Sequence, residues 1–332
     1  MIADFAKVSH GESALVAPRG LVLRDFKEYK DETIPVFWGM DFDEKINADT
    51  IIDLEKTNTM VEKEFRNKWH RNVNTTAKNY PDMTINNGLS EFADTLRHKS
   101  VILIGAGPSL KKNVKLLKDT KITTVAMLHA LPYLEKMGVT PQYVVHSDAI
   151  SLDSEFITKS SKDITMLANV IVAPRVLQKW KGGVRFFGGI GASQLGQRIN
   201  AKIEPDTRIV PMGCSMGAAI YLFDKIFNAE NFIFVGNDLA YDKKQNTHCW
   251  DGKEQSDHIE AGIKTYEMEE GSTKEKYFTC YQFYLYKRNI ENYAQMRQRT
   301  TNKRFINSTE GGMLRLWENK PLQQTLQEVA NE

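Results

Sequence analysis

The chain has 332 residues, of which 41% are hydrophobic and 26% are charged, as is ordinary for a globular protein. A formal net charge of +2 offers no general attraction to nucleic acid, so the composition argues against a nucleic-acid-binding class. The three cysteines (Cys214, Cys249 and Cys280) are widely spaced and odd in number, which argues against a disulfide framework and is typical of a reducing compartment.

The first 97 residues show no repeating alternation of strands and helices. We expect a helical N-terminal region over residues 1–97, in which Asp49 caps a helix that runs to Phe65. The chain starts without the basic and apolar segments of a signal peptide, and no apolar run is long enough to span a bilayer. The expectation is therefore a cytoplasmic protein with no membrane span.

Short strands and helices alternate from residue 98 onward. Six apolar runs are predicted to be strands, over residues 101–104, 122–127, 143–145, 164–168, 184–187 and 232–235. Helices are predicted over residues 109–117, 130–137, 174–180, 214–227 and 277–299, with a leucine-rich helix at the C-terminal end. This pattern predicts an α/β fold with a Rossmann-like, doubly wound and mostly parallel sheet, a helical N-terminal appendage and C-terminal helices.

The most informative segment joins the first predicted strand to the first helix. Residues 101–104 are apolar and mostly β-branched, as in a buried parallel strand, and Gly105 and Gly107 follow in a turn. Pro108 suits the first turn of a helix, and Ser109 can cap its free N–H groups. Because a helix that starts directly after a strand favours anions, the segment predicts a phosphate site for a nucleotide or a sugar nucleotide.

The same segment excludes two common nucleotide-binding classes. A dinucleotide fingerprint requires a third glycine where Leu110 and Lys111 stand, and no P-loop motif occurs anywhere in the chain. The alternative interpretation is an ordinary strand–turn–helix junction, in which the glycines serve the backbone geometry alone.

Polar groups follow two further predicted strands, at residues 146–148 (HSD) and 236–238 (GND). In a doubly wound sheet the ligand lies beyond the carboxyl ends of the strands, so these groups are expected to share one site with the glycine-rich turn. The carboxylates of Asp148 and Asp238 can accept hydrogen bonds from ribose or sugar hydroxyls. No residue spacing indicates a metal site, and the DFD sequence at residues 41–43 is interpreted as a chance match.

Several motifs in this order resemble those of the MptE-like domain family. They are Gly105–Leu110, Pro141–Asp148, Gly213–Gly217, Phe234–Tyr241 with Thr247 and His248, and Asn307–Gly312. The family includes the Maf motility-associated glycosyltransferases, which attach nonulosonic acids to flagellin, and the archaeal 6-hydroxymethyl-7,8-dihydropterin diphosphokinases. The glycine-rich turn also distantly resembles that of bacterial CMP-sialyltransferases.

This resemblance implies that the glycine-rich turn holds the phosphate of a CMP-activated sugar, and that residues 213–217 start a second helix facing the same ligand. The alternative for Gly213 is close helix packing. The predicted donor-binding residues are Gly105, Gly107, Pro108, Ser109, Asp148, Gly213, Ser215, Asn237, Asn307 and Glu310, the last two on resemblance alone. Two helix starts offer preorganised N–H donors, which can stabilise a departing phosphate without a metal.

An inverting glycosyl transfer requires a base that takes the proton of the acceptor hydroxyl. His248 is the first candidate and His258 the second, because both lie in a polar segment near residues 242–272 that is predicted to be a lid. The alternative for a lone histidine is a structural or merely exposed side chain. Tyr241 is predicted to stabilise the leaving phosphate, and Asp238 to bind a hydroxyl or to orient a histidine or a lid loop.

Three functional hypotheses follow. The first is an inverting, metal-independent glycosyltransferase that moves a nonulosonic sugar from a CMP-activated donor to a protein or glycan hydroxyl, without a prosthetic group. The second is a 6-hydroxymethyl-7,8-dihydropterin diphosphokinase that uses ATP and Mg²⁺, with Asp148 and Asp238 as available ligands. The third is a nucleotide-binding protein without catalytic activity.

In the first hypothesis, residues 98–272 form a core that binds the nucleotide sugar, and residues 273–332 form a C-terminal helical segment that completes the site. The expected partners are then a nucleotide sugar and a protein or glycan acceptor, without nucleic acid. An oligomer is compatible with the sequence.

Overall fold

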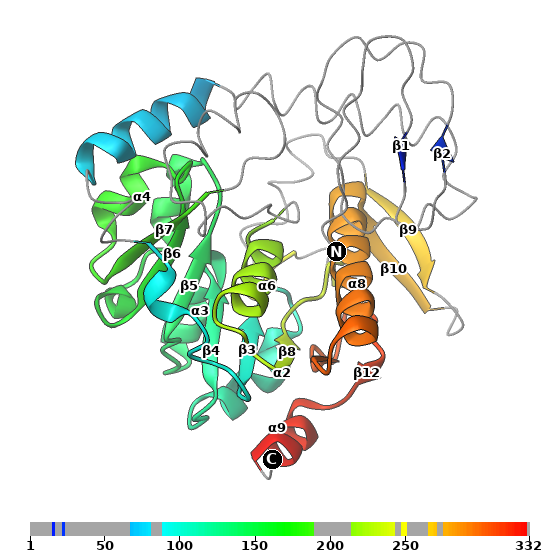
Figure 1. Cartoon of the computed structure of the whole chain (residues 1–332). Helices are drawn as coiled ribbons and strands as arrows, with labels where there is room; N and C mark the ends of the chain where they lie inside the picture. The colour runs from blue at the N-terminus through cyan, green and yellow to red at the C-terminus, as the bar shows by residue number, and fades with distance from the viewer. Residues whose placement is uncertain are drawn as a thin grey trace.

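The computed structural model describes residues 15–16, 22–23, 67–80, 88–188, 214–242, 247–250, 265–270 and 275–330. Within these residues the chain forms an eight-stranded sheet with helices on both faces (Figure 1). All neighbouring strands of this sheet run parallel, so the predicted Rossmann-like α/β class is confirmed.

The strands of the sheet are β3 (Ser100–Ile104), β4 (Thr123–Met127), β5 (Tyr143–His146), β6 (Thr165–Asn169), β7 (Val184–Phe187), β8 (Asn231–Val235), β11 (Arg304–Asn307) and β12 (Glu318–Asn319). Their spatial order is β12-β11-β8-β3-β4-β5-β6-β7. The chain therefore moves outward from β3 to β7, crosses to the other side of β3 to form β8, and continues outward to β12. The switch point lies between β3 and β8, where a ligand is expected in a doubly wound sheet.

The described helices are residues 67–79, α2 (Leu110–Asn113), α3 (Leu131–Lys136), α4 (Pro174–Lys179), α6 (Ser215–Lys225), α8 (Tyr281–Thr300) and α9 (Leu322–Ala330). Short 3₁₀ segments are η1 (Ser90–Phe92), η2 (Val114–Leu117), η3 (Leu128–Ala130), η4 (Ser151–Phe156) and η5 (Lys159–Asp163). Pro174 starts α4 at a position that needs no N–H donor. Gly138, with a φ of +73°, ends α3 in the left-handed conformation that glycine adopts without strain.

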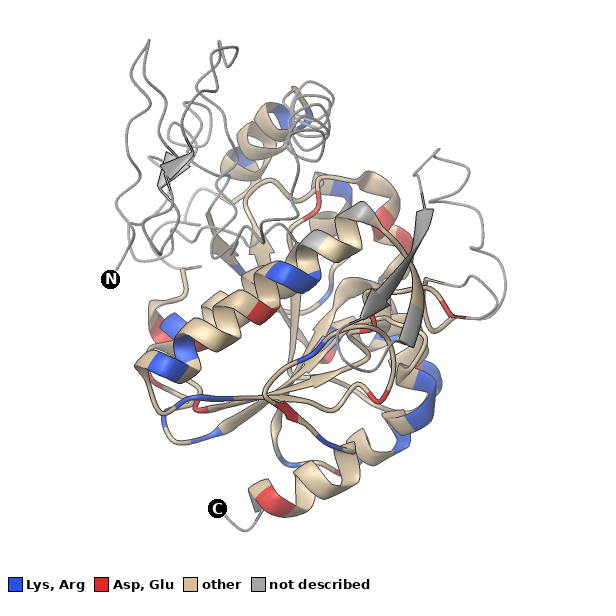
Figure 2. Cartoon of the chain, turned by 90° about the vertical axis from the view of Figure 1, so that its right-hand side faces the viewer, with Lys and Arg blue, Asp and Glu red and all other residues tan. Residues whose placement is uncertain are grey.

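Both faces of the sheet are buried, which explains why its strands are continuous apolar runs. Ile102 and Ile104 of β3 pack with helix 67–79, α2, α3, α4 and α9. Val101 and Leu103, which point to the opposite face, pack with α6 and α8. In the view of Figure 2, basic and acidic residues are scattered over the ribbon, and both kinds occur along α8.

Some elements differ from the sequence-based expectation. The predicted helix over residues 277–299 begins later, because residues up to Cys280 belong to β10 (Glu275–Cys280), which pairs with β9 (Thr265–Glu270) in an antiparallel hairpin. Strands β11 and β12 were not predicted. In the N-terminal region the structure describes helix 67–79 and a short antiparallel pair, β1 (Leu15–Val16) and β2 (Val22–Leu23).

The helix predicted from Asp49 to Phe65 lies outside the described residues. The domain boundaries at residues 97 and 272 stay predictions. In the described part of the chain, no helix combines the length and the apolar character that crossing a bilayer requires.

Candidate functional site

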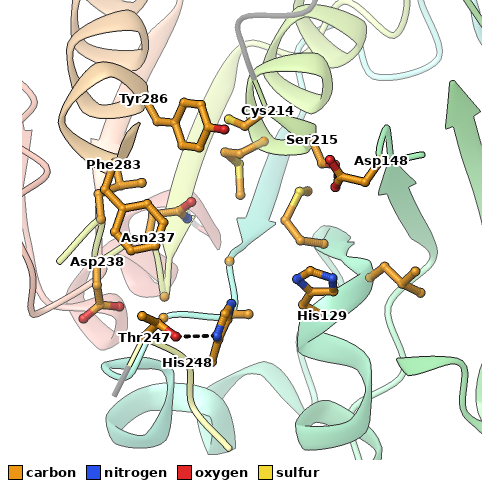
Figure 3. Close-up of a pocket in the computed structure, with 18 of the residues that line it drawn as sticks. His129, Asp148, Cys214, Ser215, Asn237, Asp238, Thr247, His248, Phe283 and Tyr286 are labelled. Carbon is orange, nitrogen blue, oxygen red and sulfur yellow. Dashed lines mark hydrogen bonds between the residues drawn. The ribbon is translucent and has the colours of Figure 1, made fainter. Parts of the chain in front are cut away.

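A pocket of about 210 Å³ lies at the carboxyl ends of β3, β4, β5 and β8, and thus at the switch point of the sheet (Figure 3). Of the residues predicted for the site, those that line this pocket are Gly105, Gly107, Asp148, Ser215, Asn237, Asp238 and His248. Strand ends that are far apart in the sequence therefore meet here, as a parallel sheet requires. The chemical roles assigned to these residues stay predictions.

The two glycines of the first turn are required by the turn that follows β8. An ideal Cβ at Gly105 would lie 2.4 Å from the carbonyl oxygen of Gly236, and one at Gly107 would lie 2.0 Å from Asp238 Oδ2. The N–H of Gly107 also donates to the Gly236 carbonyl over 2.8 Å. The two turns thus pack backbone against backbone, and this contact forms one wall of the pocket.

The carboxylate of Asp238 lies at the N-terminal end of α2, where the sequence analysis predicts a phosphate. Its carboxylate accepts a 2.7 Å hydrogen bond from the Ser109 hydroxyl and a 3.2 Å bond from the Ser109 N–H. The Ser109 side chain makes no capping bond to α2, so the predicted cap is wrong. Burial raises the pKa of Asp238 to about 6, although the Ser109 bonds and Lys112 favour the charged form.

Asn237 and the C-terminal motif hold this wall in place. Asn237 donates from Nδ2 to the Leu103 and Val235 carbonyls, each over 3.0 Å, and so ties β3 to β8. Gly312, with a φ of +65°, packs so closely that a Cβ would lie 2.2 Å from the Asp238 Cα. The C-terminal motif therefore supports Asp238 from behind.

Five predicted site residues lie outside the pocket lining. They are Pro108, Ser109, Tyr241, Asn307 and Glu310. Asn307 donates to the Leu314 carbonyl over 2.8 Å, and Glu310 accepts a 2.9 Å bond from the N–H of Leu322, the first residue of α9. Burial raises the pKa of Tyr241, which forms a β-bridge with Phe278. Gly213 and the second candidate base His258 lie outside the described residues.

The start of α6 forms the wall opposite Asp238. Cys214 caps this helix, with its Sγ accepting a 3.4 Å bond from the Gly217 N–H. The Ser215 hydroxyl accepts a 3.1 Å bond from the Ser147 N–H and lies 3.4 Å from Asp148 Oδ2. The N-terminal end of an eleven-residue helix thus points into the pocket, where its N–H groups favour negative charge.

His248 lines the pocket from the short segment at residues 247–250. Its Nδ1 lies 2.7 Å from the Thr247 hydroxyl, and its ring stacks on Trp250 with centroids 4.2 Å apart. The Cys249 N–H donates to the Ala106 carbonyl over 2.8 Å, which anchors the segment on the first turn. The imidazole is thus oriented by a hydroxyl and held by an aromatic ring at the pocket wall.

Several pocket residues were not assigned from the sequence. His129 lies two residues after the end of β4, so its position after a strand was an available signal. Phe283 and Tyr286 come from α8, and nothing in the sequence places that helix over the pocket. Burial raises the pKa of Tyr286, which keeps its hydroxyl protonated as a donor.

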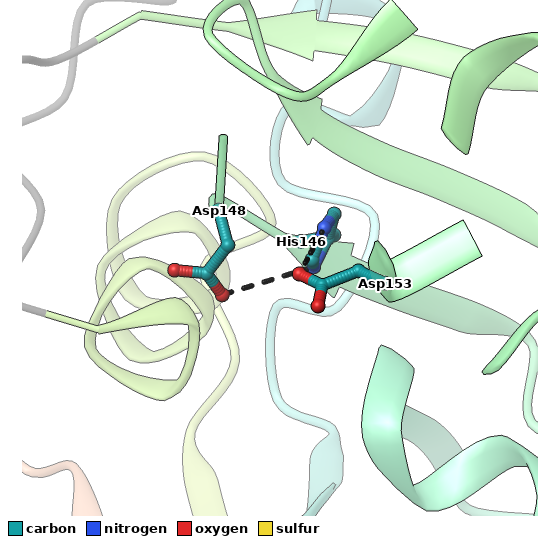
Figure 4. A group of neighbouring side chains, drawn as sticks. All are labelled: His146, Asp148 and Asp153. Carbon is teal, nitrogen blue, oxygen red and sulfur yellow. Dashed lines mark ion pairs between the residues drawn. The ribbon is translucent and has the colours of Figure 1, made fainter. Parts of the chain in front are cut away.

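Among the described residues, one group has the composition and spacing to hold a metal ion: His146, Asp148 and Asp153 (Figure 4). Burial lowers the pKa of His146, although the two carboxylates favour its charged form. His146 and Asp148 were noted in the sequence as a polar group after a strand, whereas Asp153 belongs to η4 and was not singled out.

The fold and the pocket define a Rossmann-like α/β protein with a pocket at the switch point of its sheet. The family model described as "6-hydroxymethylpterin diphosphokinase MptE-like" matches residues 74–244. The chain therefore belongs to the MptE-like family, and the predicted resemblance is confirmed.

One solved structure with a similar fold is the Maf glycosyltransferase from Magnetospirillum magneticum AMB-1, with a TM-score of 0.56 and 12% sequence identity. The alignment covers 84% of this chain but only 43% of that protein, so the chain spans less than half of its length. No curated protein matches the chain.

Proposed function

We propose that the chain is a glycosyltransferase that moves a nonulosonic sugar from a CMP-activated donor to a hydroxyl group of a protein or glycan. The observation that carries the proposal is the position of His248 and the start of α6 on one pocket. A base and a set of anion-favouring N–H donors are the two features that an inverting transfer needs. The fold shared with the Maf glycosyltransferase supports the same class.

In the proposed reaction the acceptor oxygen bonds to the anomeric carbon while the bond from that carbon to the phosphate oxygen breaks. His248 takes the hydroxyl proton, and CMP leaves with the bonding electron pair. The N–H groups at the start of α6 face the charge that develops on the phosphate. Among the described residues Tyr286 lines the pocket and Tyr241 does not, so Tyr286 replaces Tyr241 as the proposed hydroxyl donor to the leaving group.

The proposal is tested by calorimetric titration of the full chain with CMP, CDP, ATP and GTP, each with and without Mg²⁺. The expected result is a preference for CMP that does not depend on Mg²⁺. Release of CMP from CMP-N-acetylneuraminic acid is the matching activity assay. Binding of CMP without turnover of any CMP-sugar would favour the non-catalytic nucleotide-binding protein.

A second candidate function is a 6-hydroxymethyl-7,8-dihydropterin diphosphokinase, after which the matching family is named. Diphosphoryl transfer from ATP needs a divalent cation to neutralise the phosphates, and the carboxylates of Asp148 and Asp153 lie at or beside the pocket. Preferential binding of ATP that depends on Mg²⁺ would favour this function over sugar transfer.

A further inference from the structure

Three side chains from one stretch of chain converge beside the pocket. His146 ends β5, Asp148 follows two residues later, and Asp153 lies in η4. His146 Nδ1 lies 3.9 Å from Asp148 Oδ2, and His146 Nε2 lies 3.3 Å from Asp153 Oδ2. One potential ligand atom from each residue lies within 4.8 Å of the other two (Figure 4).

Two of these side chains are buried without satisfied hydrogen bonds. His146 is 1% exposed and Asp153 is 5% exposed. Although His146 Nε2 and Asp153 Oδ2 face each other, neither atom makes a hydrogen bond, and both are shielded from solvent. Buried polar atoms in proteins nearly always have a hydrogen-bond partner, so these two atoms favour a bound species that both can contact.

The third side chain connects this buried pair to the ligand pocket. The Asp148 side chain is 49% exposed and lines the pocket, and it receives a 3.4 Å hydrogen bond from the Ser215 hydroxyl. Asp153 also faces His129, whose Nε2 lies 3.4 Å from Asp153 Oδ1. A small cation can therefore enter from the pocket, and its ligands have the polar neighbours that orient metal-binding side chains.

We propose that His146, Asp148 and Asp153 bind one divalent transition-metal cation, of the Mn²⁺ or Zn²⁺ class, at the wall of the pocket. An imidazole nitrogen with two carboxylate oxygens suits these ions better than Mg²⁺ or Ca²⁺, which prefer oxygen ligands alone. One imidazole nitrogen binds the ion, with metal–ligand bonds of about 2.0–2.2 Å, so the carboxylate that lies nearer the other nitrogen must shift toward the ion. Asp148, half exposed on its loop, is placed to make this movement.

This site goes beyond the proposed function and does not depend on it, because sugar transfer as proposed needs no metal. Three protein ligands leave coordination positions open toward the pocket. These positions can take water or an oxygen atom of a bound ligand.

The test is a titration of the metal-free full chain with Mn²⁺. The electron paramagnetic resonance signal of free Mn²⁺ measures how much of the ion stays unbound. A calorimetric titration with Zn²⁺, and competition by Mg²⁺ and Ca²⁺, complete the measurement. We expect one Mn²⁺ per chain, displaced by Zn²⁺ much more readily than by Mg²⁺ or Ca²⁺. No binding of Mn²⁺ or Zn²⁺ at millimolar concentration would overturn the proposal.

Variants then locate the bound ion. Loss of a neighbour of a metal ligand commonly weakens affinity by about 10- to 100-fold, so Asp148→Asn, which removes a ligand, is expected to weaken Mn²⁺ binding by at least about tenfold. His146→Gln should do the same, and His98→Gln, at an exposed histidine paired with Glu230, should not.

Because Asp148 is half exposed, its variant is expected to fold normally, which circular dichroism checks. Unchanged Mn²⁺ affinity in folded Asp148→Asn would refute the site. Mn²⁺ binding is measured without nucleotide or sugar, so failure here and failure of the nucleotide titration are separate results.

Discussion

At the scale of single residues, Asp238 links the chemistry of the pocket to the stability of the fold. Its carboxylate bonds to Ser109 and is enclosed by the glycines of the first turn and of the C-terminal motif. A carboxylate that the chain itself supplies therefore takes the hydrogen-bond donors in front of α2. For an external phosphate, the start of α6 is the more suitable helix end in the pocket.

The pKa of Asp238 leads to a prediction about pH. Because burial raises this pKa from 3.8 to about 6, the unfolded chain ionises at a lower pH than the folded protein. The Asp238 contribution to the free energy of unfolding is therefore fully present below about pH 4 and is lost as the pH rises through about 6, by up to about 3 kcal/mol. Urea unfolding of the wild type and of Asp238→Asn across this range measures it.

The difference in stability between wild type and Asp238→Asn should thus shift in favour of the variant as the pH rises. The exposed Asp119→Asn is the control and should follow the wild type at every pH. A difference between wild type and Asp238→Asn that stays constant with pH would show that Asp238 titrates normally.

His248 gives a prediction about catalysis. Because it is the proposed base, His248→Ala is expected to lower CMP-sugar turnover by about 10²- to 10⁴-fold, while the Kd for CMP changes little. Turnover assays and calorimetry on the same preparations measure the two effects. His98→Gln, at an exposed histidine, should keep the wild-type rate. A normal rate in His248→Ala would remove it as the base.

At the scale of elements, the contact between the turns after β3 and β8 decides the shape of the pocket. Neither turn has room for a side chain at its first glycine. A Cβ at Gly105 would lie 2.4 Å from the Gly236 carbonyl oxygen, and a Cβ at Gly236 would lie 2.7 Å from the Gly105 carbonyl oxygen. The glycines therefore serve the geometry of the fold at the same time as they line the pocket. The sequence alone does not decide whether the glycines serve a ligand or the backbone geometry. The structure shows that the backbone geometry requires them.

Substitution of one of these glycines tests the contact. Gly107→Ala would place a Cβ 2.0 Å from Asp238 Oδ2, so we expect overpacking to lower the free energy of unfolding by about 1–3 kcal/mol. Gly183→Ala is the control, because a Cβ there would lie 3.5 Å from Thr165 Oγ1, an ordinary contact. Chemical denaturation compares them, and equal stabilities would show that the turns separate easily.

Elements with strong local signals were predictable, and those that depend on distant partners were not. Each predicted strand lies within one residue of the observed strand at both ends, because its apolar run is buried on both faces. Strand β11 is too short for a clear pattern in the sequence, and only its pairing with β8 shows that it is a strand. Residues 277–280 continue the aromatic pattern of α8, but their pairing with β9 makes them a strand.

At the scale of the whole molecule, the sheet extends beyond the residues that the family model matches. The match ends at residue 244, whereas β11 pairs with β8 and β12 pairs with β11. Phe232 of β8 stacks on Phe305 of β11 with centroids 4.6 Å apart. The C-terminal segment is thus part of the same hydrophobic core as the matched region.

Truncation tests this dependence. A chain that ends at residue 303 lacks β11, uncovers Phe232 and removes the support behind Asp238, so we expect no cooperative thermal unfolding transition. A chain that ends at Pro321 keeps β11 and β12 and loses only α9, so it should unfold cooperatively with a lower midpoint. Circular dichroism distinguishes the two. A chain ending at residue 303 with the wild-type midpoint would contradict the prediction.

The candidate site was partly predictable for the same reason as the strands. Residues directly after parallel strands, such as Gly105, Asp148 and Asp238, had to meet at one edge of the sheet. Tyr286 could not be found in this way, because it depends on where α8 crosses the sheet. Asp153 also escaped, because only the path of η4 brings it back to His146.

The position of β8 between β3 and β11 also has a consequence for synthesis of the chain. Ser100 in β3 and Asn231 in β8 are 131 residues apart, so β3 emerges from the ribosome long before its neighbour exists. Until then a central strand that is apolar over residues 101–104 has one open edge, which is a site for pairing with other chains. The yield of soluble protein should therefore depend on slow translation, low temperature or chaperones that shield this edge.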